Sequence, residues 1–394
     1  MTGNDFNPKS EIRNPHSAFR NPKSAVIDVN SIERELTALW KQAGEEGDDG
    51  GVTRACMLNL LIYTSQDTTV DPLDDILADI TASHPCRAIL IITNNKADKH
   101  SLVAEVTSRC TLPTSKSKQV CCEQVTLRAH GTKVNEIPSA VAPLLLSDLP
   151  VYLWWRDVPQ FSDKLFTRLT DTSDRVIIDS AVFADPHRDL LSMSHLIRET
   201  SPTTSISDLN WVRLTAWRAL LATFYDVPDY RHSLDRLHRV VIEYAIPHQG
   251  TSSLAPRALM FAGWLASRLG WRLNPNVISR RDSVTFEFNV DRRQVVVEFV
   301  PTHSSLIEAG RIARATLSCE GDSAVSFAIK RSEDRSRIET EVLLGDKKKT
   351  QRVLSYESWD EAALIGRELE IQGHDKVYEQ AVLAAAEMVA ALEK

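Results

Sequence analysis

The chain has 394 residues, of which 43% are hydrophobic and 25% charged, and its formal net charge is −7. A chain of this length can form two domains, each with its own core. The acidic balance argues against a general nucleic-acid-binding protein, because neutralising phosphates requires a basic face.

Targeting and membrane segments are not expected either. The N-terminus is polar and lacks the apolar core of a secretory signal. The longest apolar stretch, residues 140–155, is interrupted by Asp148 and two prolines and is shorter than the ~20 residues of a membrane-spanning helix. Six cysteines in a chain of this size, without a CxxC pattern, do not indicate a disulfide framework. We therefore expect a cytoplasmic protein with reduced thiols and no membrane contact.

The first thirty residues differ in character from the rest. The repeat NPKS, NPHS, NPKS recurs every seven residues over 7–24. Asn-Pro steps favour turns and disfavour helix. We predict that residues 1–30 form a disordered tail.

Residues 31–200 alternate between apolar segments of strand length and helical segments, which is typical of βαβ units. A first helix is expected from Ser31, as its cap, through Trp40. Strands are expected at 56–63, 86–92, 120–128, within 148–157 and at 175–180. Helices are expected at about 71–84, 135–146 and 163–169. The pattern predicts an α/β N-terminal domain.

Residues 201–394 read differently. After a polar connector at 201–204, a single long helix is expected over 207–226, capped by Asp208. A strand at 240–246 and a helix at 255–269 precede several short alternating strands joined by charged turns, and two helices close the chain, starting near Trp359 and Asp375. This pattern indicates an α+β domain with a mainly antiparallel sheet. The boundary is placed at 200, with a position near 159 as the alternative.

No catalytic, cofactor or metal signature is found. The chain has only 14 glycines and contains neither GxGxxG nor GxxxxGK, and GxSxG and HExxH are also missing. The eleven histidines form no convincing ligand pair. His84 and Cys86 could be half of a nucleophile–base pair, but a turn at Pro85 explains them more simply. We therefore expect no cofactor, no metal and no catalytic residue.

Two segments rich in Trp and Arg remain to be explained. Trp154 and Trp155 are adjacent on an expected strand, so their side chains point to opposite faces. Either helices cover both faces, or one indole lies with Arg156 on an exposed surface as a partner contact, since Trp and Arg are enriched in interface hot spots. The helix expected at 207–226 contains Trp211, Arg213, Trp217 and Arg218. These side chains too are either covered within the protein or exposed as partner contacts.

These segments also carry a family resemblance, specific in the WWR and DLNW-R-T-WR parts. The matching stretches are HPCRAILI (84–91), CCEQVTLRAHG (121–131), LLLSDLPVYLWWRDVP (144–159), DSAVFADP (179–186) and DLNWVRLTAWRALLATFYD (208–226). They resemble the glucose-6-phosphate dehydrogenase assembly protein family, OpcA, over about residues 31–394.

The resemblance implies a non-catalytic partner protein. Such a protein binds glucose-6-phosphate dehydrogenase, promotes its active oligomeric assembly and allosterically raises its activity in the oxidative pentose phosphate pathway. The expected partner-binding residues are Trp154, Trp155, Arg156, Trp211, Arg213, Trp217 and Arg218. Two other classes stay open: a sugar-phosphate or nucleotide-processing α/β enzyme, and a metabolite-sensing module.

Overall fold

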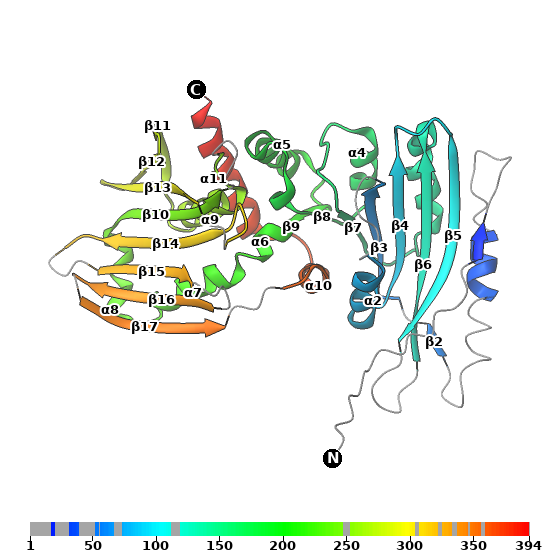
Figure 1. The fold of residues 1–394 in the computed structure, drawn as a ribbon, viewed down its shortest axis with the longest axis horizontal. Helices are drawn as coiled ribbons and strands as arrows, with labels where there is room; N and C mark the ends of the chain where they lie inside the picture. Colours follow the sequence, from blue (N-terminus) through cyan, green and yellow to red (C-terminus); the bar gives the residue numbers. More distant parts are fainter. Residues whose placement is uncertain are drawn as a thin grey trace, which may run out of the picture. The chain divides into compact units, whose positions relative to one another are not determined.

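The computed structural model describes residues 17–19, 31–38, 52–54, 56–66, 73–111, 119–246, 253–303, 307–321, 325–332, 337–345, 347–355 and 359–393 (Figure 1). The chain forms two compact units that exchange short segments. The first contains residues 1–178, 201–204 and 361–373, and the second contains 179–200, 205–360 and 374–394. Where the sequence suggests one boundary near 200, the chain therefore passes between the units five times.

The first unit is built on a mostly parallel sheet with the strand order β1-β5-β6-β4-β3-β7-β8, and β2 pairs with β6. The pairs β6–β4, β4–β3, β3–β7 and β7–β8 are parallel, whereas β5 and β1 are added antiparallel at one edge. The strands are β1 (Ser17–Phe19), β2 (Val52–Arg54), β3 (Leu58–Ser65), β4 (Cys86–Asn94), β5 (Ser101–Thr111), β6 (Gln119–His130), β7 (Val151–Trp155) and β8 (Arg175–Ile178).

Helices pack on this sheet because its central strands are apolar throughout. All five residues of β7 and the first seven of β3 are buried, as expected for parallel strands covered on both faces. Helix α2 packs against α10, and α3 packs against α4. The helical segments are residues 31–38, α2 (Leu73–Ser83), η1 (Gly131–Glu136), α3 (Ile137–Val141), η2 (Ala142–Leu144), α4 (Lys164–Asp171) and α10 (Glu361–Glu370).

The second unit contains an eight-stranded sheet with the order β11-β12-β13-β10-β14-β15-β16-β17. Every pair is antiparallel except β10–β13, which is parallel. The strands are β10 (Leu237–Ile246), β11 (Arg272–Arg280), β12 (Ser283–Val290), β13 (Arg293–His303), β14 (Ile312–Cys319), β15 (Val325–Arg331), β16 (Arg337–Leu344) and β17 (Lys347–Ser355).

Helices α9 and α11 pack against each other in this unit, and α11 also packs against α5 and β11. A Cβ atom on Gly263 of α9 would lie 2.2 Å from the carbonyl oxygen of Ala381 in α11, so only glycine permits this approach. The remaining elements are η3 (Ser180–Val182), α5 (Pro186–Glu199), β9 (Ser205–Asp208), α6 (Leu209–Val212), α7 (Thr215–Tyr225), α8 (Pro228–Arg231), η4 (Leu234–Arg236), α9 (Pro256–Arg268) and α11 (Lys376–Leu392).

The predicted fold class, an α/β domain followed by an α+β domain with a mainly antiparallel sheet, is confirmed. The single helix expected over 207–226 is wrong. Asp208 ends β9 and caps the short helix α6, and the amide of Leu214 then donates to the carbonyl of Trp211, only three residues back. This tighter turn separates α6 from α7.

The predicted N-terminal tail lies outside the described residues except for residues 17–19, which pair antiparallel with β5.

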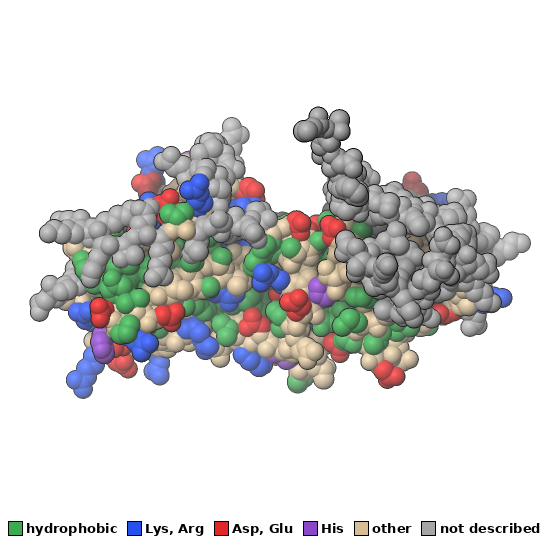
Figure 2. All heavy atoms as spheres, turned by 90° about the horizontal axis from the view of Figure 1, so that it is seen from below, with side chains coloured by type: hydrophobic (Ala, Val, Ile, Leu, Met, Phe, Trp, Pro, Cys, Tyr) green, Lys and Arg blue, Asp and Glu red, His purple; other side chains and the backbone are tan. Residues whose placement is uncertain are grey.

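Among the described helices, none has the length and apolarity needed to cross a membrane. Acidic and basic side chains are interspersed on the face shown in Figure 2.

Candidate partner-binding site

Trp155 of β7 lies in an aromatic cluster on one face of the first unit's sheet. Its ring stacks on Tyr63 of the neighbouring strand β3, with centroids 3.6 Å apart and planes inclined by 13°. The ring of Phe166 in α4 meets it edge-on, with centroids 4.9 Å apart. The Tyr63 hydroxyl lies 2.9 Å from Oγ1 of Thr93, and burial raises the pKa of Tyr63. Helix α4 therefore covers Trp155 from within the protein.

Trp154 lies on the opposite face of the sheet. The guanidinium of Arg156 sits 5.2 Å from the centroid of its ring, within the range of a cation–π contact. Arg156 also donates to both carboxylate oxygens of Glu361 at the start of α10, at 3.3 and 3.1 Å. The two indoles are only 1% and 3% exposed, so the interpretation that both faces are covered within the protein is confirmed.

A second arginine of the same sheet holds the other end of α10. The side chain of Arg175, 2% exposed, donates to Glu368 at 3.3 Å, to the carbonyl of Ile371 at 3.2 Å and to the carbonyl of Gly373. Arg156, which follows β7, holds the start of α10, and Arg175, which begins β8, holds its end. The two arginines thus fasten both ends of α10 to the sheet. A segment from near the C-terminus thus becomes part of the first unit's core.

In the second unit, Asp208 is the centre of a buried polar network. Its carboxylate accepts hydrogen bonds from the Ser180 amide at 2.9 Å, the Ser180 hydroxyl at 2.6 Å and the Asn210 amide at 2.8 Å. The Asn210 side chain donates to the Ser180 hydroxyl at 3.0 Å and accepts from Arg257 of α9. Asp208, fully buried, has its pKa raised to about 7, mainly by burial and then by the nearby Asp179 carboxylate, against the opposing effect of these hydrogen bonds.

Arg213 closes this network toward the surface. Its guanidinium makes two parallel hydrogen bonds to the carboxylate of Asp179, both 2.8 Å long. Bidentate pairs of this kind have a defined orientation as well as charge. The side chains of Arg213 and Asp179 are 22% and 16% exposed, so the pair is held firmly and still reaches solvent.

Trp211 and Trp217 are buried, and each lies against an arginine. The Arg218 guanidinium stacks 3.4 Å from the Trp211 centroid, and Arg331 of β15 lies 5.6 Å from that of Trp217. The Trp211 indole donates at 3.0 Å to Asp375, whose carboxylate also caps α11 by accepting the amides of Val377 and Tyr378. Trp211 thus fixes the start of the C-terminal helix.

Replacing Asp375 with alanine should lower the free energy of unfolding by about 2–3 kcal/mol. The change removes the cap of α11 and leaves the Trp211 indole without its acceptor, and both losses destabilise. Urea denaturation followed by tryptophan fluorescence measures the effect. Asp375→Asn keeps one oxygen, which can still cap α11, but it lacks the second oxygen that accepts the Trp211 indole, so it should recover only the capping part of the loss. Equal costs for the two variants would contradict this role.

The predicted site residues therefore fall into two separate clusters. Trp154, Trp155 and Arg156 belong to the first unit, and Trp211, Arg213, Trp217 and Arg218 belong to the second. The four buried indoles lack the surface that a direct contact needs, whereas the three arginines are partly exposed. Sequence reasoning missed the polar partners Ser180, Asn210, Arg257, Glu361 and Asp375. Ser180 and Asn210 carried a signal because both lie in segments that resemble the family, and Asp375 carried one as the expected start of the last helix.

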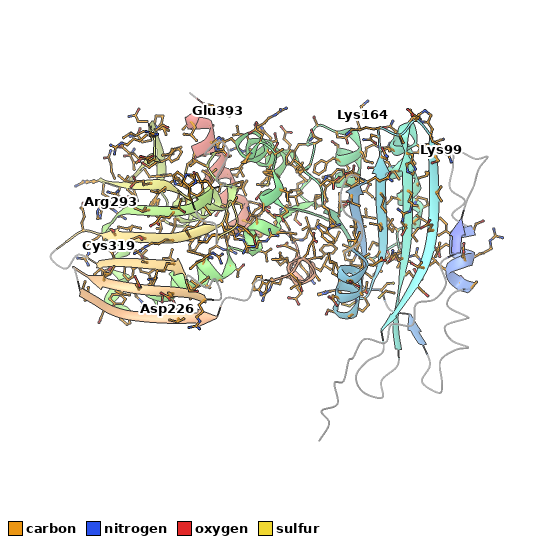
Figure 3. All side chains as sticks on the ribbon, in the orientation of Figure 1. Lys99, Lys164, Asp226, Arg293, Cys319 and Glu393 are labelled. Atoms are coloured by element: carbon orange, nitrogen blue, oxygen red, sulfur yellow. The ribbon has the colours of Figure 1, made fainter. Side chains whose placement is uncertain are left out.

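Other chemistry in the described part of the chain is limited. No group of three His, Cys, Asp or Glu side chains there could hold a metal ion. Cys86 is completely buried, and burial raises its pKa well above the ordinary value, which disfavours the reactive thiolate. Burial likewise raises the pKa of Cys319 to about 11, although Arg236 and Arg293 act against it. Cys319 and Arg293 lie toward the same end of the second unit's sheet (Figure 3).

The fold and these clusters define a class of protein with one α/β unit and one α+β unit. Its Trp, Arg and Asp residues hold helices and strands together within each unit. Two family models match it. The glucose-6-phosphate dehydrogenase subunit N-terminal domain matches residues 78–195, and the corresponding C-terminal domain matches residues 204–382.

Curated relatives agree with these matches. The chain is 32% identical over 336 residues to an OxPP cycle protein OpcA of Synechococcus elongatus, covering 82% of this chain and 72% of that protein. It is 28% identical over 319 residues to the OpcA protein of Nostoc punctiforme, covering 62% and 66%. The chain belongs to the OpcA family, which confirms the resemblance seen in the sequence. A 3-ketoreductase from Actinomadura kijaniata aligns over 85% of this chain and 96% of its own with 10% identity and a TM-score of 0.46, a similarity too low to bear on function.

Proposed function

We propose that this protein is a non-catalytic partner of glucose-6-phosphate dehydrogenase that binds it, promotes its active oligomeric assembly and activates it allosterically. Membership of the OpcA family, whose domain models are named for this dehydrogenase, is the observation that carries the proposal. We also propose that it acts in the cytoplasm, because the buried free thiols of Cys86, Cys122 and Cys319 suit a reducing compartment.

The mechanism we propose is a population shift. A partner moves the equilibrium between dissociated and assembled dehydrogenase only by its differential affinity for the two states. A tenfold shift requires a difference of only ~1.4 kcal/mol. A few well-held contacts are enough to supply this amount.

The contacts we propose are the partly exposed arginines, with the indoles as their buried supports. Trp154 lies under Arg156, and Trp211 lies under Arg218. Arg213 is held by Asp179. An arginine immobilised in this way loses little side-chain entropy when it binds, and such residues are typical hot spots.

The proposal is tested by titrating the purified protein into the host's own dehydrogenase at subsaturating substrate. NADPH formation reports activation, and size-exclusion chromatography of the mixture reports a complex. We expect saturable activation and co-elution. The proposal fails if neither is seen, or if the protein alone turns over glucose 6-phosphate.

Replacing Arg213 with methionine should raise the concentration of this protein needed for half-maximal activation about tenfold or more. The guanidinium contact is lost, whereas the fold should stay intact because the side chain is partly exposed. Arg239→Met is the matched control, since Arg239 is also a surface arginine of the second unit, paired with Glu298. Circular dichroism verifies that both variants stay folded. Equal activation by wild type and Arg213→Met would remove Arg213 from the contact surface.

A further inference from the structure

The N-terminal repeat, which the proposed function leaves unused, meets the sheet of the first unit. Its three copies occupy residues 7–13, 14–20 and 21–27, and each copy contains a serine, one further residue and an apolar residue, in the order Ser-Glu-Ile, Ser-Ala-Phe and Ser-Ala-Val. The second of these triplets is β1, Ser17–Phe19, which pairs antiparallel with β5. One copy of the repeat is therefore an edge strand of this sheet.

The strand β5 is longer than the segment that covers its outer side. It has 11 residues, and all of them pair with β6 on the inner side. On the outer side, the described part of the chain pairs with residues 104–106 alone, through β1. A strand edge presents unpaired N–H and C=O groups, which are a template for an added strand. The outer edge of β5 is thus a place where a short extended segment gains main-chain hydrogen bonds.

The register of β1 accounts for the pattern of the triplet. Its first and third positions lie opposite Val106 and Ala104, which are buried at 0% and 3% exposure. Its middle position, Ala18, lies opposite Glu105, whose side chain is 35% exposed. Opposite positions of an antiparallel pair share a face of the sheet. The edge therefore favours an apolar residue at the third position of the triplet and accepts a small or polar one in the middle.

The first copy fits the same register with one difference. Its triplet, residues 10–12, also ends on an apolar residue, but Glu11 would lie opposite Glu105. Like charges directly opposite each other destabilise a strand pair, so the first copy should bind less tightly than the second. The third triplet, residues 24–26, lacks this charge, but it ends only five residues before the helix at 31–38, so its tether to that helix is the shortest.

We propose that the outer edge of β5 is a strand-binding site for the Ser-x-apolar triplet, and that residues 10–12 exchange there with Ser17–Phe19 of the same chain. Exchange costs little, because a three-residue strand is held by few hydrogen bonds and both copies offer the same main-chain groups. The edge then stays covered whichever copy is bound, and a covered edge does not pair with other chains. The inference concerns this protein alone and does not depend on the proposed function.

The test traps the bound strand with a disulfide in the full chain. Glu105→Cys is combined with Ala18→Cys for the second copy and, separately, with Glu11→Cys for the first, because opposite residues of an antiparallel pair are close enough to be bridged. Asn14→Cys is the matched control, since residue 14 lies opposite Glu105 in neither register. Peptide mapping by mass spectrometry after mild oxidation measures the bridged fraction. We expect bridging from both copies and about tenfold less in the control.

Prolines in the second copy isolate the exchange. Successive amides of a strand point in opposite directions, so Ser17→Pro together with Ala18→Pro removes at least one donor to β5. Added to the protein that carries Glu11→Cys and Glu105→Cys, these prolines should raise bridging by the first copy about threefold, because its competitor is released. A first copy that merely lies nearby would not respond to this change.

Hydrogen exchange of residues 101–111 decides the matter if Glu105→Cys impairs folding. Prolines at 17 and 18 alone should leave the protection of β5 in place, whereas adding Ser10→Pro and Glu11→Pro should remove it. Complete loss with the first pair of prolines would overturn the exchange.

Other results would also overturn the inference. A lack of bridging from Ala18→Cys, or equal bridging from Asn14→Cys, would remove the strand-binding site. Bridging by the second copy alone, with none from Glu11→Cys even after the prolines are added, would show that the copies do not exchange. Cross-linked dimers in place of cross-linked monomers would show that the strand comes from another chain.

Discussion

Replacing Arg175 with alanine should lower the free energy of unfolding of the first unit by about 3–5 kcal/mol. Arg175 and Glu368 are almost completely buried, at 2% and 3% side-chain exposure. The substitution removes the buried countercharge of Glu368, which is strongly destabilising. Two backbone carbonyls at the end of α10 would lose their donor at the same time. Urea denaturation of the variant and the wild type measures the difference.

Arg128 offers the matched control within the same sheet. It pairs with Glu105 at 3.6 Å, but the two side chains are 42% and 35% exposed. Solvent-exposed pairs of this kind contribute at most about 1 kcal/mol, so Arg128→Ala should have little effect. If both alanine variants lost the same stability, burial of the Arg175–Glu368 pair would not be what holds α10 in place.

The wild-type protein should lose stability as the pH rises from about 4 to about 7, and Asp208→Asn should lose much less. The pKa of Asp208 in the folded protein is raised to about 7, above the ~3.9 of an unfolded aspartate. Between these values the folded state binds the proton more tightly, so unfolding becomes easier at ~1.4 kcal/mol per pH unit. Over the whole window the loss reaches roughly 4 kcal/mol. Asparagine has no proton to release.

The measurement is the free energy of unfolding of both proteins at pH 5, 6, 7 and 8. The difference between them isolates Asp208 from the other charged groups, of which Asp179, Arg213 and Arg257 lie closest in the network. Ser180→Ala provides a directional check. Losing the hydroxyl that donates to Asp208 should raise its pKa further and extend the falling slope to higher pH. Parallel pH profiles for wild type and Asp208→Asn would contradict the assignment.

Much of the first unit could be predicted from local sequence. Runs such as CRAILII form buried strands because parallel strands are covered on both faces, and β4 lies where its run predicted. The adjacency of Trp154 and Trp155 required opposite faces, and the structure places them there. Asp208 acts as a helix cap, as predicted, and the helix expected from residue 163 has Asp163 as its cap. The strand β11 was missed because its Pro275 and polar residues suit an edge strand and resemble a loop.

The sequence by itself determined the fold class, most helices and strands, and the family. The signals for these features are the spacing of apolar residues, the helix caps and the motifs, and each of them lies within a short stretch of the chain. Only the tertiary structure decided which distant residues meet. Glu368 pairs with Arg175 across 193 residues, and Ser180 bonds to Asp208 across 28. It also decided that α10 belongs to the first unit and that the indoles are supports beneath partly exposed arginines. Long-range pairing of charges depends on three-dimensional packing and burial, and no short-range periodicity encodes it.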